Sequence, residues 1–85
     1  MKKRYHLYVK SSCPFCNDAF KLLDKHQLQY TANIMDHNDE LLTEVKERYD
    51  WKTIPIIFEI SGLKGKQLIG GYTDLVNHLG EVSGD

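Results

Sequence analysis

The chain has 85 residues, of which 41% are hydrophobic, and a formal net charge of −1. This length predicts a single domain over residues 1–85, and the near-neutral charge excludes general nucleic-acid binding, which needs a basic surface. No apolar run approaches the roughly 18 residues of a membrane helix. The apolar run after the basic residues 1–4 is also too short for a signal peptide. We therefore expect a cytoplasmic protein with no membrane partner.

The first third of the chain predicts a strand, a helix and a second strand. Residues 5–10 are rich in aromatic and β-branched side chains, which favours a strand. Pro14 suits the first turn of a helix from about residue 14 to residue 26. Its apolar face would consist of four side chains at helical spacing, Ala19, Phe20, Leu22 and Leu23. Residues 28–35 predict the second strand.

A second helix is expected after a break rich in capping residues. Either Asp36 or Asn38 can cap it, since both side chains accept hydrogen bonds from free N–H groups. Asp39 and Glu40 then suit the positive end of the helix dipole. The buried stripe of this helix is expected to contain Leu41, Leu42, Val45 and Tyr49.

The last part of the chain predicts a hairpin and a short helix. Residues 56–60 form a dense apolar strand, residues 61–65 a turn, and residues 66–69 a fourth strand. Residues 74–79 are long enough for a last helix. The order β-α-β-α-β-β-α predicts an α/β protein with a mixed four-stranded sheet flanked by three helices. It is compatible with a thioredoxin-like fold, although a fold alone does not determine a function.

Cys13 and Cys16 are the two cysteines of the chain. A disulfide that closes so small a loop removes little entropy from the unfolded chain, so stability does not explain the pair. We predict no metal site, because a structural site usually needs four ligands and the histidines show no ligand spacing. These scattered histidines are His6, His26, His37 and His78. A C-x-x-C pair that follows a strand and opens a helix instead favours a redox function.

The positions of the two cysteines predict different roles. Cys13 lies at the start of a helix. The unpaired N–H groups there and the nearby Lys10 favour a thiolate. Cys16 lies one helical turn further on, where we expect it to be buried and protonated. It would be close enough to attack a mixed disulfide on Cys13. We therefore expect Cys13 to be the attacking thiol and Cys16 the resolving thiol.

Three segments resemble conserved motifs of the glutaredoxin family. Residues 10–16 are similar to its K-x-x-C-P-Y/F-C motif, residues 53–55 to its T-V/I-P motif, and residues 69–75 to its I-G-G-x-x-D-L motif. They occur in family order and span nearly the whole chain. The resemblance implies a dithiol glutaredoxin with the thioredoxin-like fold.

The resemblance also implies a glutathione site. Pro55 would follow a cis peptide bond and face the cysteines, and the main chain of Ile54 would pair with the cysteinyl backbone of glutathione. Lys10 would meet the glycine carboxylate. The start of the last helix, with Thr73 and Asp74, would hold the γ-glutamyl end. The other implied glutathione-binding residues are Phe15, Thr53, Gly71 and Tyr72.

Some of these residues also have a purely structural interpretation, and one family feature is missing. Pro55 can simply start a strand, and Asp74 can simply cap a helix. Many glutaredoxins carry a glutamine or arginine on the second helix that helps to hold the glycine carboxylate. The ungapped match here is Leu42. Either Lys46 or Arg48 substitutes for the missing residue, or the contact is absent and glutathione binds more weakly.

The implied activity is glutathione-dependent reduction of glutathione mixed disulfides and of protein disulfides. Glutathione would be a co-substrate, with no bound cofactor or metal. The partners would be glutathionylated or disulfide-containing proteins, ribonucleotide reductase among the family-level candidates, and we expect a monomer.

Two alternatives remain open. One is a redoxin of similar shape that thioredoxin reductase reduces. The other is a module in which two protomers share an iron–sulfur cluster through Cys13 and glutathione. Pro14 disfavours the cluster, because the cluster-binding relatives have glycine at that position and lack the second cysteine.

Overall fold

The computed structural model describes residues 3–80, and its elements follow the predicted order. The strands are β1 (Arg4–Val9), β2 (Gln29–Ile34), β3 (Ile56–Ser61) and β4 (Gly65–Gly70). The helices are α1 (Pro14–Lys25), α2 (Asp39–Arg48) and α3 (Tyr72–His78). The largest boundary difference is at α3, which begins at Tyr72 rather than Asp74. Residues 1–2 and 81–85 of the predicted domain, including the start of the basic N-terminal segment, lie outside the described residues.

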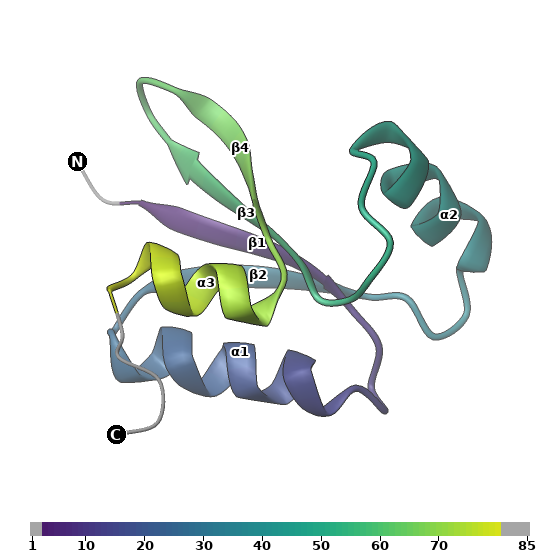
Figure 1. The fold of residues 1–85 in the computed structure, drawn as a ribbon, viewed down its shortest axis with the longest axis horizontal. Coiled ribbons are helices and arrows are strands. Elements are labelled where there is room, and N and C mark those ends of the chain that lie inside the picture. Colours follow the sequence, from purple (N-terminus) through teal and green to yellow (C-terminus); the bar gives the residue numbers. More distant parts are fainter. Residues whose placement is uncertain (1–2, 81–85) are drawn as a thin grey trace.

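The four strands form one mixed sheet in the order β2-β1-β3-β4. The inner strand β1 is parallel to β2, with Tyr5 opposite Tyr30, and antiparallel to β3. The hairpin of β3 and β4 contains an irregularity, because Ile57 pairs with Gly70 while Phe58 pairs with Leu68. Figure 1 shows α1 and α3 side by side along the sheet, with α2 set apart from them. The predicted mixed four-stranded sheet with three helices is confirmed.

The two longer helices begin at side chains that accept hydrogen bonds from their first turns. Cys13 is the N-cap of α1 and Pro14 stands in the first turn, where its missing N–H group costs nothing. Of the two candidate caps for α2, Asn38 is the one used, and its Oδ1 accepts the N–H of Leu41 at 3.2 Å. Asp36 instead accepts the backbone N–H of Ser11 at 2.9 Å. It thereby ties the segment after β2 to the loop before Cys13.

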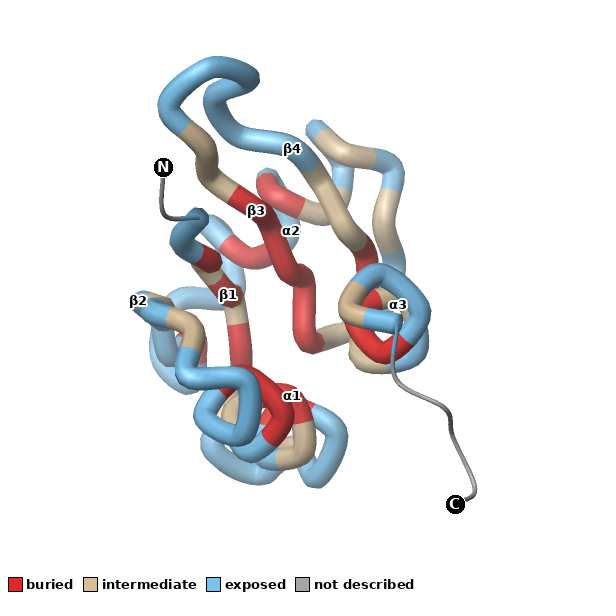
Figure 2. Tube along the Cα trace, turned by 90° about the vertical axis from the view of Figure 1, so that its left-hand side faces the viewer, coloured by how far each residue is buried: buried red, intermediate tan, exposed pale blue. Residues whose placement is uncertain are grey.

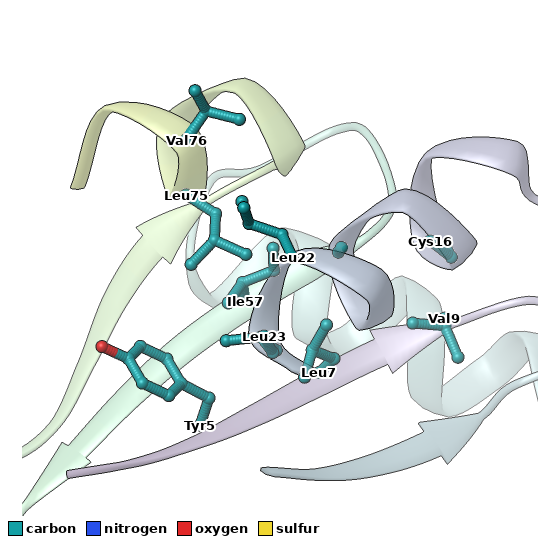
Figure 3. Close-up of a cluster of buried hydrophobic side chains, with 10 residues drawn as sticks. Tyr5, Leu7, Val9, Cys16, Leu22, Leu23, Ile57, Leu75 and Val76 are labelled. Atoms are coloured by element: carbon teal, nitrogen blue, oxygen red, sulfur yellow. The ribbon is translucent and has the colours of Figure 1, made fainter. Parts of the chain in front are cut away.

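Two apolar clusters cover the two faces of the sheet. The first lies between the sheet and the helices α1 and α3, and Figure 3 shows most of it: Tyr5, Leu7, Val9, Cys16, Ala19, Leu22, Leu23, Ile57, Leu75 and Val76. The second lies under α2 and consists of Met35, Leu42, Val45, Ile56 and Phe58. Neighbouring residues of β3 point to opposite faces, so this strand is buried on both sides (Figure 2).

The prediction that Leu41 is buried is wrong. Its side chain is 37% exposed, whereas Leu42 and Val45 carry the contact between α2 and the sheet. Consecutive residues lie about 100° apart around a helix, so with Leu42 and Val45 turned toward the sheet, Leu41 lies at the edge of that contact. Trp51 also packs against this second cluster.

One carboxylate lies inside the protein, at the end of the sheet opposite to the cysteines. Glu59 is only 6% exposed and accepts the hydroxyl of Tyr5 at 2.8 Å. It also contacts His78 Nε2 at 2.5 Å and Lys3 Nζ at 3.7 Å. Burial alone would raise the pKa of Glu59, but the hydrogen bonds with His78 and Tyr5 outweigh it and lower that pKa. Burial, and then the bond to Glu59, raises the pKa of Tyr5.

We expect Glu59→Ala to lower the free energy of unfolding by about 1–3 kcal/mol, because it leaves the buried Tyr5 hydroxyl without its acceptor. The pKa of Glu59 is lower in the folded state, so its ionisation stabilises the fold above the ordinary glutamate pKa of roughly 4. That contribution is lost as the pH falls through the folded-state pKa. Urea unfolding at several pH values measures both effects. Glu44→Ala, at an exposed position of α2, is the control, and equal losses in both variants would contradict the prediction.

Candidate active site

Cys13 lies between the end of β1 and the first turn of α1. Its backbone is extended, with φ −100° and ψ 110°, and its Sγ accepts the N–H of Cys16 at 3.2 Å. Its own N–H donates to the carbonyl of Lys10 at 3.3 Å. The sulfur therefore stands at the positive end of the helix dipole and accepts one of the unpaired N–H groups there. This is the position that the sequence predicted for an attacking thiol.

Cys16 lies in the first apolar cluster, among side chains of β1 and α1 (Figure 3). It is 1% exposed, and both cysteines are free thiols. Burial, and then its interaction with Cys13, raises the pKa of Cys16 to about 12. A thiol in this state does not attack external disulfides at neutral pH, because the thiolate is the nucleophile. Its location thus agrees with the predicted role of a resolving thiol.

We expect iodoacetamide to modify Cys13 in the native protein at neutral pH and to leave Cys16 unmodified. Cys13 is partly accessible, whereas Cys16 is buried and has a pKa of about 12. Mass spectrometry of the digested protein identifies the modified cysteine. The control is the same reaction in denaturant, where both cysteines should react. Equal labelling of the two in the native protein would contradict this assignment.

The loop before β3 lies against the sulfur of Cys13. The Ile54 carbonyl is 3.9 Å from Cys13 Sγ, and the peptide bond between Ile54 and Pro55 is cis, as the family resemblance implied. Gly71 packs on the same loop. A Cβ atom added to Gly71 would lie 3.7 Å from the Pro55 carbonyl oxygen and 3.9 Å from Thr53 Oγ1. The fold therefore brings Thr53, Ile54, Pro55 and Gly71 to the side of Cys13.

The start of α3 is built around Asp74. Its Oδ2 accepts the N–H of Gly71 at 2.9 Å, so Asp74 does cap the helix. Gly70 has φ +126°, and a Cβ atom there would lie 2.5 Å from the same carboxylate oxygen. Only glycine suits this combination of positive φ and close approach. Thr73 is exposed beside Asp74.

Two aromatic rings bridge the starts of α1 and α3. Phe15 follows Pro14 and is 59% exposed. Its ring stacks on that of Tyr72, with a centroid distance of 6.1 Å and an interplanar angle of 27°. Large exposed apolar groups beside a reactive residue are typical of binding surfaces. Phe15 and Tyr72, both predicted as glutathione-binding residues, are thus in contact with each other.

Lys10 has a partner that the sequence analysis missed. Its Nζ lies 3.1 Å from Oδ1 of Asp39 in the first turn of α2. We had interpreted Asp39 only as a complement to the helix dipole, and residues 29 positions apart show no contact signal in one sequence. The ammonium group expected to act on Cys13 and on glutathione therefore forms an ion pair with a carboxylate.

The second helix does not supply the glutamine or arginine with which many glutaredoxins help to hold the glycine carboxylate. Leu42, at the ungapped position, is buried in the second cluster. Lys46 and Arg48 stand in the last turn of α2, whereas Asp39 beside Lys10 stands in the first. At 1.5 Å per residue, Lys46 lies about 10 Å further along the helix axis than Asp39. Neither basic residue is therefore placed to take over the missing contact.

Among residues 3–80, no helix is long and apolar enough to cross a membrane. Within the same residues, no three His, Cys, Asp or Glu side chains are grouped so that they could hold a metal ion. A shallow hollow of about 490 Å³ lies at the start of β1 and β2, lined by residues that include Arg4, Leu28 and Tyr30. Cys13 follows the other end of β1, so this hollow is not part of the thiol site.

Known proteins similar to this chain support the expectations for its family and its fold. Glutaredoxin-1 of Ectromelia virus is 36% identical over 76 residues, which cover 82% of this chain and 66% of that protein. This chain thus spans slightly less than two thirds of that relative. The structure of a wheat glutaredoxin superposes with a TM-score of 0.72 at 28% identity, covering 87% of this chain and 71% of the other.

A second solved structure is also similar to this chain in its fold. A glutaredoxin from Brucella melitensis superposes with a TM-score of 0.65 at 24% identity, covering 91% of this chain and 80% of the other. This similarity concerns the fold alone, and with the wheat protein it confirms the thioredoxin-like fold. The sequence model of the glutaredoxin family matches residues 6–63. Since that match covers more than half of the residues, this chain belongs to the glutaredoxin family.

Proposed function

We propose that this chain is a thiol–disulfide oxidoreductase that uses glutathione to reduce glutathione mixed disulfides and protein disulfides. One observation carries the proposal: the Cys13 sulfur stands at a helix start, accepts the Cys16 N–H at 3.2 Å and lies 3.9 Å from the Ile54 carbonyl. This arrangement combines an accessible nucleophile, a nearby second thiol and a free stretch of main chain. Thiol–disulfide exchange on a peptide-like substrate requires these three features.

The first step is attack by the Cys13 thiolate on the glutathione sulfur of a mixed disulfide. A new disulfide forms between Cys13 and glutathione while the old S–S bond breaks. The substrate leaves as a thiolate and takes up a proton. The Cys16 N–H and the start of α1 stabilise negative charge on the Cys13 sulfur before the attack and after its release.

The second step regenerates the enzyme. A second glutathione attacks the glutathione sulfur bound to Cys13, oxidised glutathione leaves, and the Cys13 thiolate is restored. With a protein disulfide, the mixed disulfide joins Cys13 to the protein. Cys16 attacks the Cys13 sulfur, which releases the protein thiolate and forms a disulfide between Cys13 and Cys16. One glutathione opens that internal disulfide by binding to Cys13, and a second removes the first as oxidised glutathione, so that both thiols are restored. The raised pKa of Cys16 means that this thiol must lose its proton during the attack rather than before it.

The proposed glutathione site follows the residues around Cys13. The main chain of Ile54 would pair with the cysteinyl part of glutathione, in the manner of a short added strand. Asp74 would receive the γ-glutamyl ammonium group, with Thr73 beside it. Lys10 would receive the glycine carboxylate. This arrangement is supported by the closeness of Gly71, at the start of α3, to the loop of Thr53 and Pro55.

A coupled assay tests the proposal. The wild-type chain is supplied with glutathione, glutathione reductase, NADPH and a mixed disulfide of glutathione with a small thiol, and NADPH oxidation is followed. We expect rapid turnover that depends on glutathione. Turnover only when glutathione and glutathione reductase are replaced by thioredoxin reductase would instead identify the redoxin that thioredoxin reductase reduces.

A further inference from the structure

The ammonium group of Lys10 is already paired with a carboxylate in the protein. Lys10 Nζ is 3.1 Å from Asp39 Oδ1, and the two side chains are 34% and 79% exposed. Asp36 lies close by as well, since its pKa is lowered first by hydrogen bonds from Ser11 and also by the charges of His37 and Lys10. A carboxylate that approaches Lys10 therefore meets a lysine whose charge is already balanced by aspartates.

The same neighbourhood accepts a neutral group more easily than an anion. An ammonium group has three N–H donors, so Lys10 can donate to a carbonyl while it keeps Asp39. A second carboxylate at the same place would be repelled by Asp39, because two like charges within about 4–6 Å disfavour each other. A peptide amide in place of the glycine carboxylate carries no charge and avoids this repulsion.

We propose that Asp39 is a specificity residue that weakens recognition of the free glycine carboxylate of glutathione by holding Lys10 in an ion pair. The inference rests on the proposed function. It identifies the preferred substrates as disulfides in which the residue after the reacting cysteine continues into a neutral peptide bond, as in a protein chain, instead of ending in a carboxylate. Asp39 touches neither thiol, so it acts through Lys10 and not on the chemical step.

We expect Asp39→Asn to raise kcat/KM for a glutathione mixed disulfide about 1.4- to five-fold. This range corresponds to the roughly 0.2–1 kcal/mol of an exposed ion pair, which is what Asp39 and Lys10 form. The gain should appear in KM rather than in kcat, because binding of the carboxylate improves while the thiols are unchanged. It should also shrink at high ionic strength, because salt screens exposed charges.

The test compares two mixed disulfides that share one cysteine peptide. One carries glutathione, and the other carries glutathione whose glycine carboxylate has been converted to an amide. Asp39→Asn should improve the first substrate and leave the second within experimental error. Glu40→Gln is the matched control, since it removes the same charge from the same helix turn, and the described contacts of Lys10 do not include it.

A double variant decides whether the effect passes through Lys10. In a Lys10→Met background, Asp39→Asn should change neither substrate. The inference is overturned by equal gains with both substrates, by an equal gain in Glu40→Gln, or by a loss of activity in Asp39→Asn. Each of these outcomes leaves the proposed function intact, because wild-type turnover of the glutathione disulfide is measured in the same series. A wild-type chain without that turnover overturns both.

Discussion

Cys13→Ser is expected to reduce both activities, on glutathione mixed disulfides and on protein disulfides, to the level of the uncatalysed reaction. Cys13 makes the first attack in both reactions, and a serine hydroxyl does not form an anion at neutral pH that could replace the thiolate. The fold should be unaffected. Cys13 is the N-cap of α1, and serine is among the preferred residues at that position.

The measurement is the coupled assay with each substrate, on protein whose folding has been checked by circular dichroism and thermal unfolding. Ser12→Ala is a suitable control, because it changes an exposed neighbour and leaves both thiols in place. A folded Cys13→Ser variant that still turns over either substrate would show that another group makes the first attack. The assignment of Cys13 would then be wrong.

Cys16→Ser is expected to separate the two activities. Reduction of glutathione mixed disulfides should be largely retained, because a second glutathione can regenerate Cys13 without Cys16. Reduction of protein disulfides should be lost, because no internal thiol can then resolve the mixed disulfide with the protein. The first reaction can even become faster, since the unproductive internal disulfide no longer forms.

This prediction is tested with two variants, Cys16→Ser and Cys16→Ala. Cys16 is fully buried among apolar side chains, so a serine hydroxyl there costs about 1–3 kcal/mol if it finds no partner. Cys16→Ala removes the thiol without adding a polar group. Loss of both activities in a folded alanine variant would contradict the separate roles. It would favour the redoxin reduced by thioredoxin reductase, in which both cysteines are needed in every turnover.

The local features of the molecule were predictable from the sequence because each rests on neighbouring residues. The aromatic and β-branched side chains of residues 5–10 and the apolar run of residues 56–60 indicated strands, and Pro14 after Cys13 indicated the start of α1. Burial of Cys16 followed from its place one turn inside that helix. The positions of Pro55 and Gly71 beside Cys13 came from the family resemblance, and the structure brings them there.

The features that the sequence did not reveal are contacts between distant residues. The bond between Lys10 and Asp39 joins residues 29 positions apart, and the bond between Tyr5 and Glu59 joins residues 54 positions apart. Asp39 already had a sufficient local explanation as an acidic residue in a first helical turn. Glu59 stands in an apolar strand, and a buried carboxylate requires partners. That requirement was a signal in the sequence, but it does not tell which residues satisfy it.

The central claim is that Cys13 carries the glutathione intermediate and does not need Cys16 for it. The most direct test is to incubate Cys16→Ser with oxidised glutathione, digest the protein without reductant and locate the adduct by mass spectrometry. We predict one glutathionyl group on the peptide that contains Cys13, removed again by added glutathione. A variant that is folded but acquires no glutathionyl group at Cys13 would contradict the mechanism proposed for this chain.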